Sequence, residues 1–456
     1  MSSFLISNPK GILTGLDGAR ARQAGDIRVR DGMIAEIGTL TPERDEEIVD
    51  ASGCVVTPGL VNTHHHLFQS VMKAAPQGIN EELAKWLRLV PYRYWDAIDE
   101  EALRVSATIG LAELVLSGAT SVADHHYLFS PQYDFDPLET LFGVAGRFGV
   151  RFVLCRGGAT KGRNFDGDNT TPLPTETVEA MIGAVEDAAG KWNDPAPDAM
   201  RRIVMAPTTP TFSLEEGELK EIAAAGRALG LRLHSHLSEN TDYNNYTLSK
   251  YNMRPVDWIA QHDWLGPDVW FAHLVTCEPE EVKLLFDTGT GMAHCPQENA
   301  RLGSGIAPAD LLADLGGTVS LAVDGAAGNE AADMITALYS AFTIHRASKG
   351  VAAISAERAL HWATAGGAKV LGLEAVGTIE AGKSADLVLY ETRAPRYFGQ
   401  HDPLVGPIVS GGEPRIRRSY VAGREIVRDG AIPWLDMDQL AADAERVVRR
   451  MASKAA

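Results

Sequence analysis

Between residue 58 and about residue 373 the sequence repeats one pattern: a short apolar run, a polar or glycine-containing loop, then a longer segment of helical periodicity. Strands that alternate with helices call for a parallel sheet, because parallel neighbours cannot be joined by a tight turn. Eight such units in about 300 residues predict a closed (β/α)8 barrel of the TIM type. The predicted strands end near Asn62, Ala123, Cys155, Ala206, His236, Leu274, Cys295 and Asp324.

The segment before the second predicted strand shows the helical pattern clearly. Leu103, Ala107, Leu111 and Leu114 recur at helical spacing, and Gly118 follows as a stop signal. The loop over residues 162–174, rich in Asp, Asn and Thr, is predicted to be a mobile segment of an active site.

Both ends of the chain differ from this pattern. Short alternating runs at 27–29 and 33–37, broken by a turn, predict hairpins, and similar runs return at 377–379, 385–390 and 420–427. We therefore expect a small β-sandwich made from both chain ends, with boundaries 1–57, 58–374 for the barrel, and 375–456. A last helix is predicted from about Asp438, with one apolar face: Leu440, Ala444, Val447, Val448 and Met451.

Composition narrows the choice of partner. The chain has 60 acidic against 42 basic residues, a net charge of -18, which disfavours nucleic acid and anionic membrane surfaces. A small neutral molecule is the expected partner. The four cysteines lie far apart, the amino terminus lacks a charged segment leading into an apolar one, and no apolar run reaches the roughly 20 residues of a membrane span. These features predict a reduced, cytoplasmic protein.

Several predicted strands end in residues that bind metals. His64 and His66 are two residues apart at the end of the first strand, so their side chains point the same way. His236 ends the fifth strand and Asp324 the eighth, and in such barrels the strand ends form the active face. We assign these four residues to one divalent metal ion, Zn(II) first, with Fe(II) also compatible.

Each assignment has a plainer alternative. Asp324 could cap the helix that follows it, although its place after an apolar run favours ligation. His234 has the parity of His236 but lies deeper, where packing or support of a ligand is expected. A lone buried histidine is usually a hydrogen-bonded core residue. That is the expectation for His125, His126, His262, His294, His345, His361 and His401.

Two further residues can take part in proton transfer. Glu239 follows His236 by three residues, so its carboxyl group can border the same cavity and shuttle a proton, although a solvated loop carboxylate is the alternative. His273, at the end of the sixth strand, is expected to donate a hydrogen bond to the substrate or the attacking water. Metal coordination lowers the pKa of bound water toward neutrality, and Asp324 can accept its proton.

Together these motifs resemble the amidohydrolase superfamily, in its aminohydrolase and chlorohydrolase branch. The resemblance covers nearly the whole chain, and it implies that a metal-activated water displaces ammonia or another leaving group from a heteroaromatic ring. It also implies that Glu239 protonates a ring nitrogen. Members with two metals carry a bridging lysine after the fourth strand; here residues 202–209 contain no lysine, which favours one metal.

The substrate is predicted from fewer residues. Gln69 lies where guanine-type deaminases of this branch place an amide that pairs with the ring, and Arg156 could hold a substrate oxygen through its forked donors. Trp86 and Tyr127 could stack on a planar ring. All four could equally be structural, as surface amides and arginines or packed aromatic residues.

Segments 64–70, 123–127, 156–160 and 324–330 are similar to the isoxanthopterin deaminases of this branch. The resemblance implies deamination of an oxidised pterin, with 8-oxoguanine or isocytosine as the second possibility and s-triazine dechlorination as the third. A non-catalytic scaffold of the same fold is a hypothesis of another class; it is disfavoured because every ligand position is filled. Family behaviour suggests a homodimer.

Overall fold

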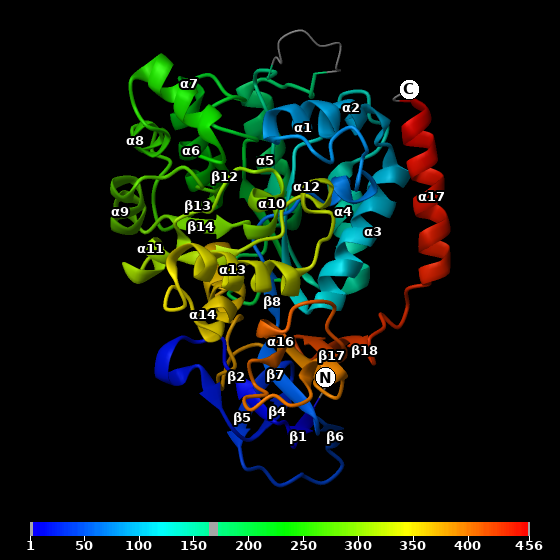
Figure 1. The fold of residues 1–456 in the computed structure, drawn as a ribbon. Coiled ribbons are helices and arrows are strands. Elements are labelled where there is room, and N and C mark those ends of the chain that lie inside the picture. Colours follow the sequence, from blue (N-terminus) through cyan, green and yellow to red (C-terminus); the bar gives the residue numbers. More distant parts are fainter. Residues whose placement is uncertain (1–2, 164–171, 455–456) are drawn as a thin grey trace.

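Eight parallel strands form a barrel in the centre of the molecule (Figure 1). The computed structural model describes residues 3–163 and 172–454, so most of the predicted loop over 162–174 lies outside the described residues. The strands are β8 (Leu60–Asn62), β9 (Ala119–His126), β10 (Arg151–Arg156), β11 (Arg201–Met205), β12 (Arg232–Leu237), β13 (Val269–His273), β14 (Gly291–His294) and β15 (Val319–Leu321). The backbone N–H of Thr63 donates to the carbonyl of Leu321 at 3.3 Å, which brings the last strand beside the first. The predicted (β/α)8 barrel is confirmed.

Two predicted strand ends differ from the structure. β9 ends at His126 rather than at Ala123, because its last residues continue the parallel register with the end of β10. β15 ends at Leu321, and Asp324 follows in a left-handed conformation with φ of 62°, so the chain has already left the strand there.

Helices cover the outside of the barrel. The predicted helix before the second strand is α3 (Glu100–Ser117), which begins at Asp99, whose carboxylate accepts from the N–H of Ala102, and ends at Gly118 with φ of 106°. The other long helices are α4 (Pro137–Phe148), α5 (Val178–Trp192), α6 (Glu218–Ala228), α7 (Thr241–Tyr251), α9 (Pro279–Thr288) and α13 (Met334–Lys349). Shorter ones are α1 (Leu83–Leu89), α2 (Pro91–Tyr94), α8 (Pro255–Ala260), α10 (Pro296–Arg301), α11 (Ala309–Asp314), α12 (Ala326–Asn329), α14 (Ala356–His361), α15 (Gly367–Leu371) and α16 (Gly406–Val409). Among the described residues, none of the helices combines the length and apolar character that a membrane crossing needs.

Small side chains fill the inside of the barrel. Alternate strand residues point inward and pack together: Val61, Ala123, Val153, Cys155, Val204, Ala206, Ala272, Ala293, Cys295 and Ala322. Trp270 is the large exception; it stacks on His234 with ring centroids 4.4 Å apart and donates from Nε1 to the carbonyl of Thr63 at 3.2 Å. The barrel interior is therefore filled with side chains beneath the carboxyl ends of the strands.

The two chain ends meet in two sheets below the barrel (Figure 1). One sheet contains β1 (Phe4–Ser7), β4 (Asp26–Arg30), β5 (Met33–Gly38) and β6 (Glu47–Asp50). The other contains β2 (Gly11–Leu13), β3 (Arg22–Gln23), β7 (Cys54–Pro58), β16 (Leu387–Glu391), β17 (Ile416–Val421) and β18 (Arg424–Arg428), with β7 antiparallel to β16. The predicted sandwich from both ends is confirmed, whereas residues 377–379 do not form the predicted strand. The exact boundaries 1–57, 58–374 and 375–456 stay a proposal.

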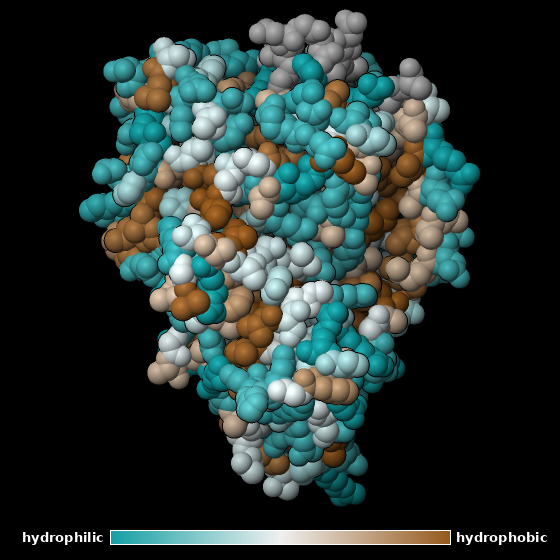
Figure 2. All heavy atoms as spheres, viewed as in Figure 1, coloured by the Kyte–Doolittle hydropathy of each residue, from teal (hydrophilic) through white to brown (hydrophobic). Residues whose placement is uncertain are grey.

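The last helix, α17 (Met437–Lys454), runs along the side of the barrel against α3 (Figure 1). Its buried residues are Val447 and Met451, whereas Val448 is 45% exposed, so the predicted apolar face is narrower than expected. Figure 2 shows apolar side chains gathered along this helix on the visible face. Arg446 binds Glu101 at 2.6 Å on the outside of this contact.

A buried ion pair joins the barrel to the terminal sheets. Arg151 begins β10, and its Nε and Nη2 donate to the two carboxylate oxygens of Asp386 at 2.7 and 2.9 Å. The side chains are 1% and 2% exposed. A buried bidentate ion pair of this kind fixes the orientation of the terminal sheets relative to the barrel, because a buried charge without its partner is strongly destabilising.

We predict that Arg151→Met destabilises the protein by about 3–5 kcal/mol, because it leaves the Asp386 carboxylate buried without its cation. The shift of the urea unfolding midpoint would measure this. Arg446→Met is the matched control; it breaks an exposed pair and should cost less than about 1 kcal/mol. Equal shifts for the two variants would contradict the assigned role.

Candidate metal centre

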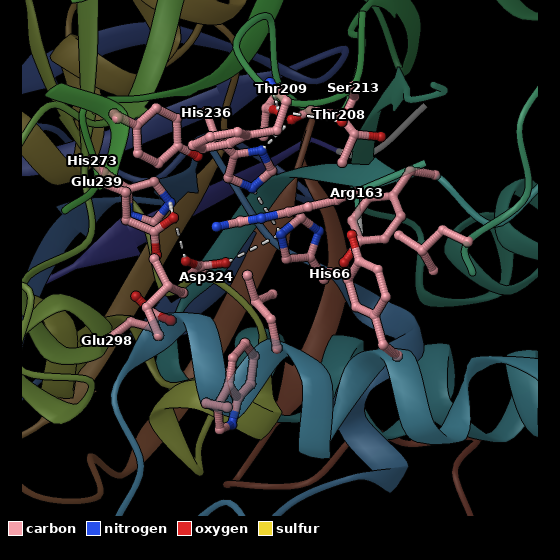
Figure 3. A pocket seen from close by; sticks show the side chains of 18 of the residues that line it. His66, Arg163, Thr208, Thr209, Ser213, His236, Glu239, His273, Glu298 and Asp324 are labelled. Carbon is pink, nitrogen blue, oxygen red and sulfur yellow. Dashed lines mark hydrogen bonds and ion pairs between the residues drawn. The ribbon is translucent and has the colours of Figure 1, made fainter. Parts of the chain in front are cut away.

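A cavity opens at the carboxyl ends of the barrel strands, and Figure 3 shows side chains that line it. Its lining residues come from loops after most of the strands. They include His66, Gln69, Trp86, Tyr92, Tyr127, Arg163, Thr208, Phe212, His236, Glu239, Tyr243, His273, Glu298 and Asp324.

At the bottom of the cavity the predicted metal ligands come together. The Nε2 atoms of His64 and His66 each lie 3.4 Å from Oδ1 of Asp324, and the Nε2 atoms of His66 and His236 are 3.1 Å apart. Donor atoms that share one tetrahedral zinc at about 2.0–2.1 Å have separations close to these. Four residues from three distant segments of the sequence thus have the geometry of one ligand set.

Backbone carbonyls fix the tautomers of two of these histidines. Nδ1 of His66 lies 2.7 Å from the carbonyl of His125, and Nδ1 of His236 lies 2.6 Å from that of Thr208. A carbonyl only accepts, so each Nδ1 must donate, and each Nε2 therefore presents its lone pair to the cavity.

A third histidine is fixed through a neighbour. His234 donates from Nδ1 to the carbonyl of Trp270 at 2.9 Å, so its Nε2 accepts from Nδ1 of His64 at 2.8 Å. Nε2 of His64 then carries a lone pair, and it has no hydrogen-bond partner among the described residues. All three Nε2 lone pairs point at the same place, which fits a divalent cation.

Burial keeps these imidazoles neutral, as ligation requires. It lowers the pKa of His66 to about 3 and the pKa of His64 and His236 below its usual value. Burial alone would raise the pKa of Asp324, but the surrounding imidazoles, first that of His64, outweigh it and hold that pKa well below normal. The carbonyl of Asp324 accepts from Nδ1 of His65 at 2.5 Å, so His65 is not among the residues that present a nitrogen to the cavity.

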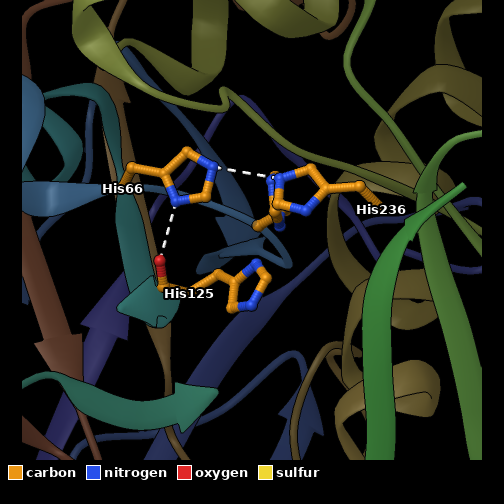
Figure 4. Close-up of side chains that lie close together, drawn as sticks. His66, His125 and His236 are labelled. Carbon is orange, nitrogen blue, oxygen red and sulfur yellow. Dashed lines mark hydrogen bonds between the residues drawn. The ribbon is translucent and has the colours of Figure 1, made fainter. Parts of the chain in front are cut away.

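His125 lies closer to this group than predicted (Figure 4). Its ring centroid is 4.8 Å from that of His236, and one of its ring nitrogens lies within 4.8 Å of the ligand nitrogens of His64, His66 and His236. Nε2 donates to the carbonyl of Ala206 at 2.8 Å, whereas Nδ1 has no partner among the described residues. His125 is thus a buried, hydrogen-bonded histidine, as predicted, and in addition it lies beside the ligand group.

Glu239 and His273 lie on one side of the ligand group. Oε2 of Glu239 is 3.8 Å from Nε2 of His273, which in turn is 3.5 Å from Oδ2 of Asp324. Burial raises the pKa of Glu239 to about 7, so the carboxyl can hold or release a proton near neutral pH. Non-glycine residues with positive φ hold this edge of the site: Ser238 (52°), His273 (77°), Leu274 (54°) and Asp324 (62°).

Three of the four predicted substrate residues line the cavity, and one does not. Gln69, Trp86 and Tyr127 lie in its wall. Arg156 is instead bound to Glu176, with its guanidinium 4.0 Å from the ring centroid of Phe129. The reason is strand parity: Cys155 points into the barrel, so the next residue points out.

Sequence reasoning missed several residues of the wall. Arg163 and Glu298 are the charged ones. Glu298 follows the seventh strand by four residues, which is a signal of the same kind as Glu239 after the fifth. Arg163 lies seven residues beyond β10, in a loop whose path no periodicity predicts.

Known sequences similar to this chain include deaminases. The model of the "Amidohydrolase family" matches residues 55–425. The chain is 46% identical to an isoxanthopterin deaminase from an unknown prokaryotic organism, covering 98% of this chain and 97% of the relative. It is 36% identical to an 8-oxoguanine deaminase of Pseudomonas aeruginosa, covering 97% of each.

A solved structure is also similar. An atrazine chlorohydrolase from Arthrobacter aurescens TC1, complexed with zinc, superposes with a TM-score of 0.91 at 26% identity, covering 98% of this chain and 100% of that one.

We predict that His234→Ala weakens zinc binding about 10–100-fold, because His64 loses the acceptor that fixes its tautomer. Equilibrium dialysis with zinc would measure the change. His234→Gln keeps an acceptor oxygen and should recover part of the affinity, and His262→Ala, outside the cavity, should leave it unchanged. Wild-type affinity in a folded His234→Ala variant would contradict this role.

Proposed function

Because the chain belongs to the amidohydrolase family, we propose that it is a metal-dependent hydrolytic deaminase with isoxanthopterin as its first candidate substrate. The reaction replaces the 2-amino group of the ring with oxygen from water and releases ammonia. The observation that carries the proposal is the convergence of three imidazole lone pairs and one carboxylate beside the buried carboxyl group of Glu239.

We assign the metal to His64, His66, His236 and Asp324. Three neutral nitrogens and one carboxylate favour Zn(II), and Fe(II) is the alternative. When bound, a divalent cation supplies Lewis acidity that makes water a nucleophile near neutral pH.

Two carboxyl groups divide the proton transfers. Asp324 stays ionised, so it can accept a proton from the attacking water. Glu239, with a pKa of about 7, can donate its proton to a ring nitrogen. When the amino group leaves, Asp324 can pass it the proton taken from water, and Glu239 can recover a proton from the remaining hydroxyl as that becomes the ring carbonyl.

His273 positions the reacting atoms between these two acids. Its Nδ1 donates to Oδ1 of Asn299 at 2.9 Å, so Nε2 can donate to the substrate, as the sequence suggested, only when the ring is an imidazolium. Nε2 lies 3.5 Å from Oδ2 of Asp324 and 3.8 Å from Oε2 of Glu239, within reach of both carboxyl groups.

Four residues of the wall suit a planar, oxygenated ring. Gln69 can pair with a ring carbonyl and nitrogen, and Trp86 and Tyr127 offer aromatic surface. Arg163 takes the role that the sequence suggested for Arg156, as the cationic donor to a substrate oxygen.

Other substrates present the same edge. 8-Oxoguanine and isocytosine carry the same 2-amino-4-oxo pyrimidine edge as isoxanthopterin, so Gln69 cannot distinguish them, and the relatedness to an 8-oxoguanine deaminase favours this second candidate. An s-triazine chlorohydrolase would use the same ligand set. A non-catalytic scaffold is disfavoured, because the ligand positions and Glu239 are all filled. A homodimer in the cytoplasm remains our proposal for its state in the cell.

We predict that ammonia release is fastest with isoxanthopterin when isoxanthopterin, 8-oxoguanine and isocytosine are compared by kcat/KM. A higher value for 8-oxoguanine would move the assignment to the second candidate. Turnover of none of the three by zinc-loaded protein would remove the substrate proposal.

We predict that Glu239→Gln lowers deamination about 10²–10⁴-fold, because the proton shuttle is lost. Metal content should be unchanged, since Glu239 is not one of the assigned ligands. Measuring both quantities on one preparation separates the two effects. Glu216→Gln, an exposed carboxylate outside the cavity, is the control, and a Glu239→Gln variant that loses its metal would contradict the assignment.

A further inference from the structure

A second group of ligand-type side chains lies beside the assigned metal ligands. Glu239, His273 and Glu298 each offer one donor atom, and these atoms all lie within 4.8 Å of one another. His273 ends β13, whereas Glu239 and Glu298 follow the neighbouring strands β12 and β14. Glu239, His273 and Glu298 are 5%, 0% and 3% exposed. Figure 3 shows them on the same side of the cavity as Asp324.

Two of these donor groups have atoms without partners. Among the described residues, Nε2 of His273 and Oε2 of Glu298 make no hydrogen bond. A buried polar atom without a hydrogen-bond partner costs about 1–3 kcal/mol, and two such atoms in one cluster of donor groups indicate a ligand. Because Nδ1 of His273 donates to Asn299, the neutral ring directs the Nε2 lone pair toward the carboxylates, an unfavourable arrangement that a cation at that point reverses.

The donor set indicates which cation would bind. Two carboxylates balance a charge of +2, and the imidazole nitrogen favours zinc over magnesium or calcium, which prefer oxygen alone. Three protein ligands leave a position for solvent, as in exchangeable sites. With one nitrogen ligand instead of three, this group should bind more weakly than the assigned centre.

We propose that Glu239, His273 and Glu298 form a second, inhibitory site for a divalent cation of the zinc type. The inhibition rests on the proposed function, because a cation bound to Glu239 and His273 would occupy the groups assigned to proton transfer. The two sites are adjacent, since Asp324 lies 3.5 Å from His273. Excess zinc would therefore switch the enzyme off without removing the catalytic ion.

The test is a zinc titration of enzyme that already holds one equivalent. Equilibrium dialysis with metal analysis gives the number of ions bound, and isoxanthopterin turnover is followed in parallel. We expect the wild type to bind a second equivalent as activity falls. Glu298→Gln should keep the first equivalent, because Glu298 is not one of the assigned ligands, but should need at least about 10-fold more free zinc both to bind the second equivalent and to lose its own starting activity.

Glu215→Gln, an exposed carboxylate paired with Lys161 and outside the cavity lining, is the matched control and should behave as the wild type. Binding that stops at one equivalent without inhibition would overturn the proposal, as would a Glu298→Gln variant that binds the second equivalent like the wild type. Failure to hold a first equivalent, or no turnover at any zinc level, would count against the proposed function instead; the stoichiometry of the second ion would still decide this inference.

Discussion

The hydrogen bonds that imidazole Nδ1 atoms make below the cavity determine what the site can do. The carbonyl of His125, near the end of β9, orients His66, and the carbonyl of Thr208, in the loop after β11, orients His236. His234 fixes His64 in the same way. His125 and His234 are placed by the register of parallel strands, so this part of the geometry follows from the barrel itself. Without these hydrogen bonds each ring could present either nitrogen, and the three lone pairs would not converge.

The terminal sheets contribute to this order from the opposite end. β7 leads directly into β8, and Arg151 at the start of β10 is bound to Asp386 next to β16. The amino ends of the barrel strands are therefore fixed by an ion pair and by backbone continuity with the terminal sheets. Their carboxyl ends lead into loops of varied length. This division is typical of such barrels, where stability and chemistry occupy opposite ends of the strands.

Much of this could be predicted from the sequence, because strand ends and their parity are local properties. The alternation of strands and helices gave the barrel, and polar residues at the ends of apolar runs gave the residues that converge in the cavity. Prediction failed where the path of a loop decides the outcome. Arg156 follows the inward-facing Cys155 by one residue and so points out of the barrel. Arg163 instead reaches the cavity, through a loop without periodicity. The sequence identifies His125 only as a core histidine, because its distance from His236 depends on how β9 and β12 are placed in space.

Four residues at the rim of the site have left-handed backbone conformations that favour glycine, although none of them is glycine. Each costs conformational energy, of the order of 1 kcal/mol. Replacing Ser238 with glycine would remove part of this conformational cost and stabilise the protein. It would also give the backbone next to Glu239 more freedom, so the position of that carboxyl group would be less well defined. Stabilising substitutions are therefore better sought in the terminal sheets and the outer helices than at these four positions.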